Sequence, residues 1–89
     1  MSRQFQKDPD AILDYTVDWS RWLGTDTILT SQWTVPTGLT EVSATNTPTS
    51  ATVWLSGGTA GQSYPVTNRI TTAGGRTEDR TITIRVEER

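Results

Sequence analysis

Apolar residues alternate with polar ones along several short stretches of this chain, and that period of two limits its fold more than any other feature. In the clearest stretch, Ile82, Ile84 and Val86 alternate with threonine and arginine. Such alternation is typical of a β-strand with one face toward a core and the other toward water. No stretch keeps the 3.6-residue period of an amphipathic helix for long. The sequence therefore predicts an all-β fold.

Turn residues divide the chain into short strands. Strands are predicted over residues 12–19, 27–35, 39–44, 51–55, 64–70 and 81–86. A bulge is expected near Ser31 and Gln32, because Ile28 and Trp33 fall in opposite phases of the alternation. About seven short strands with frequent turns in a chain of this length favour an immunoglobulin-like antiparallel β-sandwich. Tyr64 stands where such a sandwich has a tyrosine corner, with its hydroxyl bonded to upstream backbone.

The N-terminal segment is polar and lacks the alternation of the later stretches. Between Arg3 and Asp10, Phe5 is the only bulky apolar side chain. The sequence predicts an extended N-terminal arm over residues 1–11 and the sandwich over residues 12–89. Extended arms can add to a neighbour's sheet edge, so Phe5, Lys7 and Asp8 are candidate contacts with a partner. Deletion of the arm is expected to leave the sandwich folded.

The four tryptophans divide into two kinds. Trp19 and Trp33 are in phase with apolar neighbours and are predicted to fill the core. Trp54 is out of phase with its apolar neighbours and should face away from the core. Trp22 lies in an irregular stretch. Trp22 and Trp54 are candidate partner anchors, because exposed aromatic residues often anchor interfaces. Packing beneath a loop or against a neighbouring strand is the alternative for both.

Residues suited to catalysis are scarce. Enzymes working at neutral pH usually use histidine, cysteine, a perturbed pair of acids or a metal. The chain has no histidine and no cysteine, and its sole lysine, Lys7, lies in the predicted arm. Asp8 and Asp10 begin a spacing like that of a calcium loop, but Ile12 and Leu13 stand where a ligand and the turn glycine belong. The residues predict a non-enzymatic protein with no cofactor and no metal site.

Charge and hydropathy narrow the choice of partners. The formal net charge is −2 and no basic run stands out, so nucleic acid is not an expected partner. No stretch approaches the roughly 20 apolar residues of a membrane span. The polar N-terminus lacks the apolar core of a signal peptide. We therefore expect no membrane partner, and synthesis in a cytoplasm.

Short segments in both halves of the chain carry a family resemblance. In the first half they are Lys7-Asp8-Pro9-Asp10, Leu13-Asp14-Tyr15, Asp18-Trp19-Ser20, Trp22-Leu23 and Asp26-Thr27-Ile28. In the second half they are the run from Trp54 to Gly61, then Tyr64, Val66, residues 67–72 and Gly75-Arg76-Thr77. In this order they resemble the small bacteriophage virion proteins called fiber-tail adaptors, over nearly the whole chain. The second half is also similar to bacterial immunoglobulin-like and fibronectin-like modules.

The resemblance implies a structural protein of the virion, made in the host bacterial cytoplasm. Its role would be that of a tail or fiber adaptor, or of particle decoration, through docking to tail, neck, fiber or capsid proteins. Virions are symmetric, so several copies are expected to act together. The alternative is a carbohydrate-binding or adhesion module of immunoglobulin-like fold. A third possibility, an accessory domain of an enzyme, requires a longer parent polypeptide.

Overall fold

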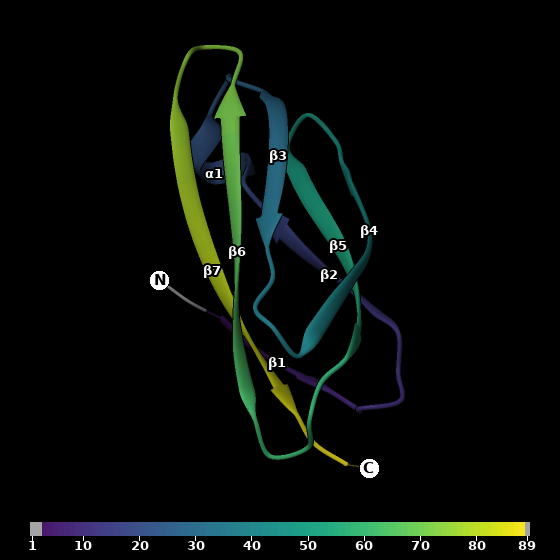
Figure 1. Cartoon of the computed structure of the whole chain (residues 1–89). Helices are drawn as coiled ribbons and strands as arrows, with labels where there is room; N and C mark the ends of the chain where they lie inside the picture. The colour runs from purple at the N-terminus through teal and green to yellow at the C-terminus, as the bar shows by residue number, and fades with distance from the viewer. Residues whose placement is uncertain (1–2, 89) are drawn as a thin grey trace.

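Seven strands and one helical turn make up the computed structural model, which describes residues 3–88. They are β1 (Arg3–Lys7), β2 (Leu13–Asp18), α1 (Ser20–Leu23), β3 (Ile28–Thr34), β4 (Leu39–Asn46), β5 (Ser50–Gly57), β6 (Ser63–Thr72) and β7 (Thr77–Val86). The strands form a four-stranded sheet of order β1-β7-β6-β3 and a three-stranded sheet of order β2-β5-β4. The two sheets pack face to face (Figure 1). The prediction of a β-sandwich is confirmed at this level.

Two details of the predicted fold class are wrong. The sheets are not antiparallel throughout, because β1 pairs with β7 in parallel and makes the larger sheet mixed. The fold is also not purely β, since α1 occupies part of the stretch after β2. This helix is a single turn, closed by Leu23 N donating to Trp19 O at 2.9 Å. Gly24 ends the helix with φ at 64°, a value that favours glycine.

The N-terminal segment does not extend away from the sandwich, at least over Arg3–Lys7. Its register runs from Arg3 opposite Ile82 to Lys7 opposite Val86. The polar composition of the segment suggested an arm, but Phe5 is half-buried and Lys7 is buried. The prediction of an extended arm is therefore corrected for these residues, which form an edge strand of the larger sheet. For Met1 and Ser2 the prediction lies outside the described residues.

The core lies between the sheets, as the alternation predicted. Its fully buried large apolar side chains are Trp19, Val53, Leu55, Val66, Ile70, Ile84 and Val86, joined by the nearly buried Ile82. Tyr64 is half-buried and packs against this cluster. Its hydroxyl accepts a hydrogen bond from Thr59 N at 2.9 Å, which confirms the predicted bond to upstream backbone. A Cβ on Gly38, where φ is 110°, would lie 2.7 Å from Tyr64 Cε1, so only glycine lets the ring pack there.

The bulge in β3 exists but lies earlier than predicted. The register shifts between Ile28 and Thr30, not near Ser31 and Gln32. Ile28 is consequently buried and Trp33 is half-buried, whereas Thr30 is exposed. β4 also has a register shift, between Glu41 and Ser43, that the sequence did not indicate.

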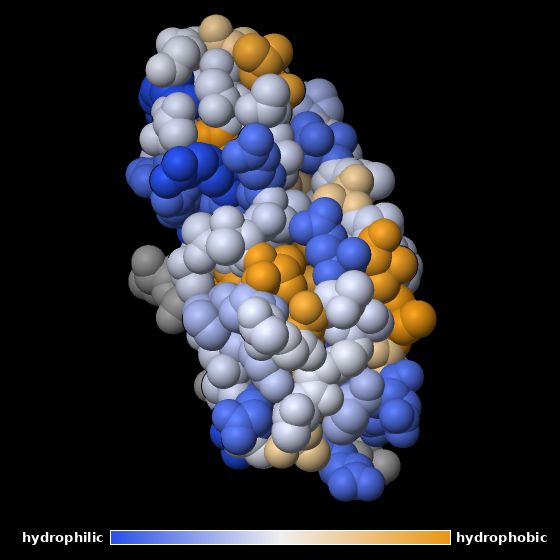
Figure 2. Space-filling view, viewed as in Figure 1, coloured by the Kyte–Doolittle hydropathy of each residue, from blue (hydrophilic) through white to orange (hydrophobic). Residues whose placement is uncertain are grey.

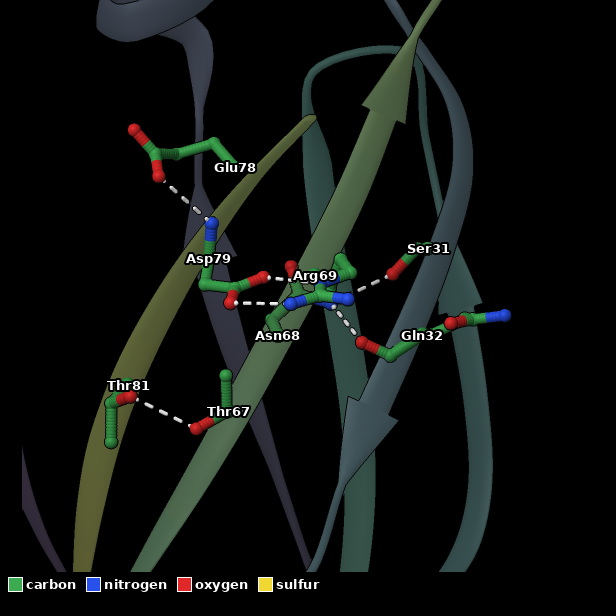
Figure 3. A network of polar contacts seen from close by, with 8 residues as sticks. All are labelled: Ser31, Gln32, Thr67, Asn68, Arg69, Glu78, Asp79 and Thr81. Carbon is green, nitrogen blue, oxygen red and sulfur yellow. Dashed lines mark hydrogen bonds and ion pairs between the residues drawn. The ribbon is translucent and has the colours of Figure 1, made fainter. Parts of the chain in front are cut away.

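A buried polar network joins the two sheets around Asn68 on β6. Trp19 Nε1 donates to Asn68 Oδ1 at 2.9 Å. Asn68 Nδ2 donates in turn to Ser31 Oγ at 2.9 Å and to the Gln32 carbonyl at 3.0 Å, as Figure 3 shows. Because both ends of the amide are bonded, its burial carries little penalty. The network fixes the end of β2 against β6 and β3.

Candidate functional site

Lys7, a predicted partner contact, is almost wholly enclosed by its own chain, with 1% of its surface exposed. Its ammonium donates to Gly57 O at 2.7 Å and to Asp8 O at 2.9 Å. Burial lowers the pKa of this lysine, and the nearby carboxylates of Asp8 and Asp10 partly oppose that shift. Since Gly57 ends β5, this side chain ties the two sheets together.

Phe5 and Asp8, the other predicted contacts of this segment, also have internal partners. The Phe5 ring is half-buried and meets the Tyr15 ring edge-on, with centroids 5.3 Å apart. Tyr15 donates its hydroxyl to the Gln6 carbonyl at 3.1 Å, and burial raises its pKa, with a smaller contribution from Asp14. Asp8 Oδ1 accepts from the Asp10 backbone at 2.9 Å. The contacts of Phe5 and Gln6 with Tyr15 hold β1 against β2 of the other sheet.

Trp22 on α1 is half-buried, which matches the alternative of packing beneath a loop. Its ring lies edge-on to Trp19 at 5.5 Å between centroids. The guanidinium of Arg76 covers the ring at 4.1 Å from its centroid. The exposed part of this indole is thus already capped by a cation from the β6–β7 hairpin.

Asp26 holds this end of the molecule together, a role that the sequence pattern did not indicate. Its carboxylate accepts from Thr27 N at 2.8 Å, from Gly74 N at 2.9 Å and from Arg76 Nε at 3.2 Å. Hydrogen bonding by the Thr72 hydroxyl first, and then by these groups, lowers the pKa of Asp26 to about 2. No local pattern could indicate partners almost fifty residues away.

Trp54 is placed as predicted, facing away from the core. It is 40% exposed, whereas Val53 and Leu55 on either side are fully buried. In the register, Trp54 lies between Asp14 of β2 and Ser43 of β4, on the central strand of the smaller sheet. The ring therefore stands in the middle of an open sheet face.

The predicted contact residues do not converge on one site. Phe5, Lys7 and Asp8 lie at the end of the sandwich where β1 runs, and α1 with Trp22 lies toward the other end (Figure 1). Trp54 is separate from both groups, on the outer face of the three-stranded sheet. Of the five residues, only Trp54 is both exposed and without a ring or hydrogen-bond partner among residues 3–88.

The described part of the chain holds neither a cluster of metal ligands nor a membrane-spanning helix. No group of three histidine, cysteine, aspartate or glutamate side chains there is arranged to hold a metal ion. No helix within residues 3–88 has the length and apolar character to cross a membrane. Asp14 and Asp18 lie on the exposed side of β2, as expected for a solvated strand face.

A small β-sandwich whose buried side-chain polar atoms are bonded internally, except Trp33 Nε1, and whose smaller sheet is open around an indole has the form of a binding module. A family model for the podophage GP4 fiber-tail adaptor protein gp77 matches residues 7–85. The match spans most of the chain, and the chain belongs to this family. It is accordingly a non-enzymatic structural component of the phage virion, and its adaptor role implies binding to other virion proteins. No curated protein matches the chain.

Proposed function

We propose that this adaptor docks to its virion partner through the outer face of the β2-β5-β4 sheet. This surface, the Trp54 face, comprises Asp14, Thr16, Ser43, Thr52 and Trp54. Trp54 carries the proposal, because it is a large ring left 40% exposed on a central strand, with no ring or side-chain hydrogen-bond partner among residues 3–88. Exposed tryptophans are favoured anchors at protein interfaces, where a partner removes the ring from water.

Within residues 3–88, the opposite side of the sandwich exposes Leu29 on β3 but no aromatic side chain comparable to Trp54. Figure 2 shows the surface over β7, β6 and β3, where neutral and hydrophilic residues surround apolar groups near the middle, along the right edge and at the top of the view. Its charged side chains include Arg69 and Asp79, which pair at 2.7 Å, and Arg85 and Glu87, which pair at 3.4 Å. Internally paired charges offer little to a partner, so this side is the weaker candidate.

An immunoglobulin-like topology is also part of the proposal. The order β2-β5-β4 corresponds to strands B, E and D of such a domain, and β7-β6-β3 corresponds to strands G, F and C. The bond from Thr59 N to the Tyr64 hydroxyl, near the start of β6, supports the same assignment. Domains of this class bind through loops, faces or free sheet edges, and β3 and β4 are free edges here.

We further propose that several copies act together in the particle. Structural proteins of a virion are arranged by symmetry, and repeated weak contacts add up when their carriers are linked. One modest face per copy, centred on a single indole, is then enough for stable attachment.

The test replaces Trp54 in phage particles. A phage lacking this gene is complemented with wild-type protein, with Trp54→Ala or with Leu29→Ala. Leu29 is the matched control, because it is also a large exposed apolar residue, 66% exposed, but lies on β3. Loss of an anchor tryptophan weakens a contact by about 2 kcal/mol or more, roughly thirtyfold in affinity.

We expect particles made with Trp54→Ala to contain little of the chain and few fibers, and those with Leu29→Ala to resemble wild type. Quantitative mass spectrometry of purified particles measures both components. Circular dichroism of each variant checks that it folds. Wild-type content of folded Trp54→Ala protein would contradict the proposed docking face.

A further inference from the structure

All the charged residues on the strands of the smaller sheet are acidic. β2, β5 and β4 contain Asp14, Asp18 and Glu41 but no lysine or arginine. Arg80 on β7 donates to the Asp18 carbonyl at 3.0 Å, so a positive charge lies near that end of β2. Asp14 and Glu41 are exposed and form no ion pair with any residue from 3 to 88. Negative charge on and beside the Trp54 face is therefore uncompensated.

Asp14 and Trp54 are direct cross-strand neighbours on β2 and β5. Side chains in such positions start about 5 Å apart and lie on the same face of the sheet. A cation over the indole can therefore also reach the carboxylate, and gains from both the ring and the charge.

Elsewhere in the chain, an indole ring and a carboxylate are contacted together by one of the chain's own arginines. At the α1 end, Arg76 lies 4.1 Å over the Trp22 ring and bonds Asp26 at 3.2 Å. On the Trp54 face the indole and the carboxylate are present, and the arginine is missing. Arginine suits this place better than lysine, because its planar group stacks on rings and bonds carboxylates in a fork.

We infer that the Trp54 face binds a basic surface of another virion protein, with an arginine of that protein stacked on Trp54 and paired with Asp14. This inference rests on the proposed function and names the chemistry of the partner. A second copy of the chain is a poorer occupant. Among the arginines whose side chains the structure describes, those on β6, β7 and the hairpin between them are bonded internally, and the exposed Arg21 on α1 is the exception.

A sugar is also a poorer occupant of this face. The Thr16 and Thr52 hydroxyls bond each other at 2.8 Å across β2 and β5. Each is thereby less free to bond the hydroxyls of a sugar. The remaining neighbour across β4 is Ser43, whose short side chain reaches only a little way above the sheet.

The test is an NMR titration of the purified full chain with a hexa-arginine peptide. The indole N–H signal of Trp54 is assigned by its loss in Trp54→Phe. We expect a saturable shift of this signal that weakens as salt is raised, and no shift with hexa-glutamate. Asp14→Asn should weaken binding about fivefold, and the matched neutralisation Glu88→Gln less than about twofold.

Three results would overturn the inference. Equal weakening by Asp14→Asn and Glu88→Gln would mean unspecific attraction to an acidic protein. Saturable shifts of Trp54 by an oligosaccharide panel would assign the face to sugars. Self-association in sedimentation that Arg21→Gln abolishes would assign it to a second copy.

Particle composition separates failure of this inference from failure of the proposed function. If Trp54→Ala is excluded from particles but Asp14→Asn is incorporated at the wild-type level, the face docks and its partner is not basic. If Trp54→Ala is incorporated normally, the docking face itself is wrong. Exclusion of both variants, with normal incorporation of Glu88→Gln, supports both proposals.

Discussion

The Asp26 carboxylate is the clearest case of a single residue joining distant segments. It bonds the chain just before β3, the hairpin between β6 and β7, and the guanidinium that covers Trp22. Because the pKa of Asp26 falls from 3.8 unfolded to about 2 folded, its stabilising effect is present above pH 4. That effect is lost as the pH falls through about 2.

Asp26→Asn should therefore melt at a lower temperature than wild type at pH 7, and the difference should shrink between pH 4 and pH 2. Thermal unfolding followed by circular dichroism across this range measures both effects. Glu88→Gln, which neutralises an exposed carboxylate after β7, is the control. A difference that stays constant down to pH 2 would mean that the charge of Asp26 is not what matters.

A second prediction for a single residue concerns Ile84, which is fully buried between the sheets. Ile84→Ala should lower the free energy of unfolding by about 2–4 kcal/mol, as large-to-small core changes do. Thr83→Ala on the opposite side of β7 should cost much less. Urea unfolding of the three proteins gives the comparison, and an equal loss in both variants would place Ile84 outside the core.

Residues whose role depends on their own strand were predictable, and residues whose role depends on a distant partner were not. The alternation of apolar and polar residues within one strand is enough to predict which face of the sheet Trp54 points to. The same holds for Ile82 and Ile84. Lys7 gave no signal, because a lysine in a polar segment is usually solvated, and its acceptor Gly57 lies fifty positions away. Asn68 did carry a signal, since it shares the buried phase of Val66 and Ile70 and therefore needs partners.

Among the strands, β1 is where the structure departs most from the sequence-based expectation. The strand covers the edge of β7 and is fixed by the Phe5–Tyr15 contact and the Lys7 ammonium. The expectation that the N-terminal segment is dispensable for folding is replaced by the opposite expectation. Parallel pairing with the last strand could not be predicted, because neither partner's local pattern specifies the other.

Deletion of residues 1–7 should lower the midpoint of urea unfolding, since it exposes the edge of β7 and removes the tie to β5. Deletion of residues 1–2, which leaves all of β1, is the matched control and should have little effect. Lys7→Met keeps the length of the side chain and tests the ammonium alone. Unchanged stability without residues 1–7 would restore the idea of a dispensable arm.

The strand bulges show a second limit for individual strands. The alternation in β3 predicted one extra residue but not its position, and β4 gave no indication of its own shift. A bulge is placed by the partner strand and the core it must fit, and these are tertiary properties. The existence and the facing of β5, β6 and β7 were predictable from period two, because those strands are regular.

Over the molecule as a whole, most pairings join strands far apart in the chain. β1 pairs with β7, β2 with β5, and β3 with β6, while β4–β5 and β6–β7 are neighbours. Folds dominated by such distant pairings form on a timescale of about milliseconds to seconds. Stopped-flow refolding followed by tryptophan fluorescence should show this. Refolding within microseconds would contradict the pairing order.

The parallel pairing of β1 with β7 also determines how the molecule resists a stretching force. A force applied at Arg3 and at Val86 draws the two strands in opposite directions along their own axes. The hydrogen bonds between them are then loaded side by side, so they must break together. In an antiparallel hairpin such as β6–β7, a pull on the two open ends breaks the bonds one after another. A pull along the line of the first and last strands is thus resisted by hydrogen bonds that share the load.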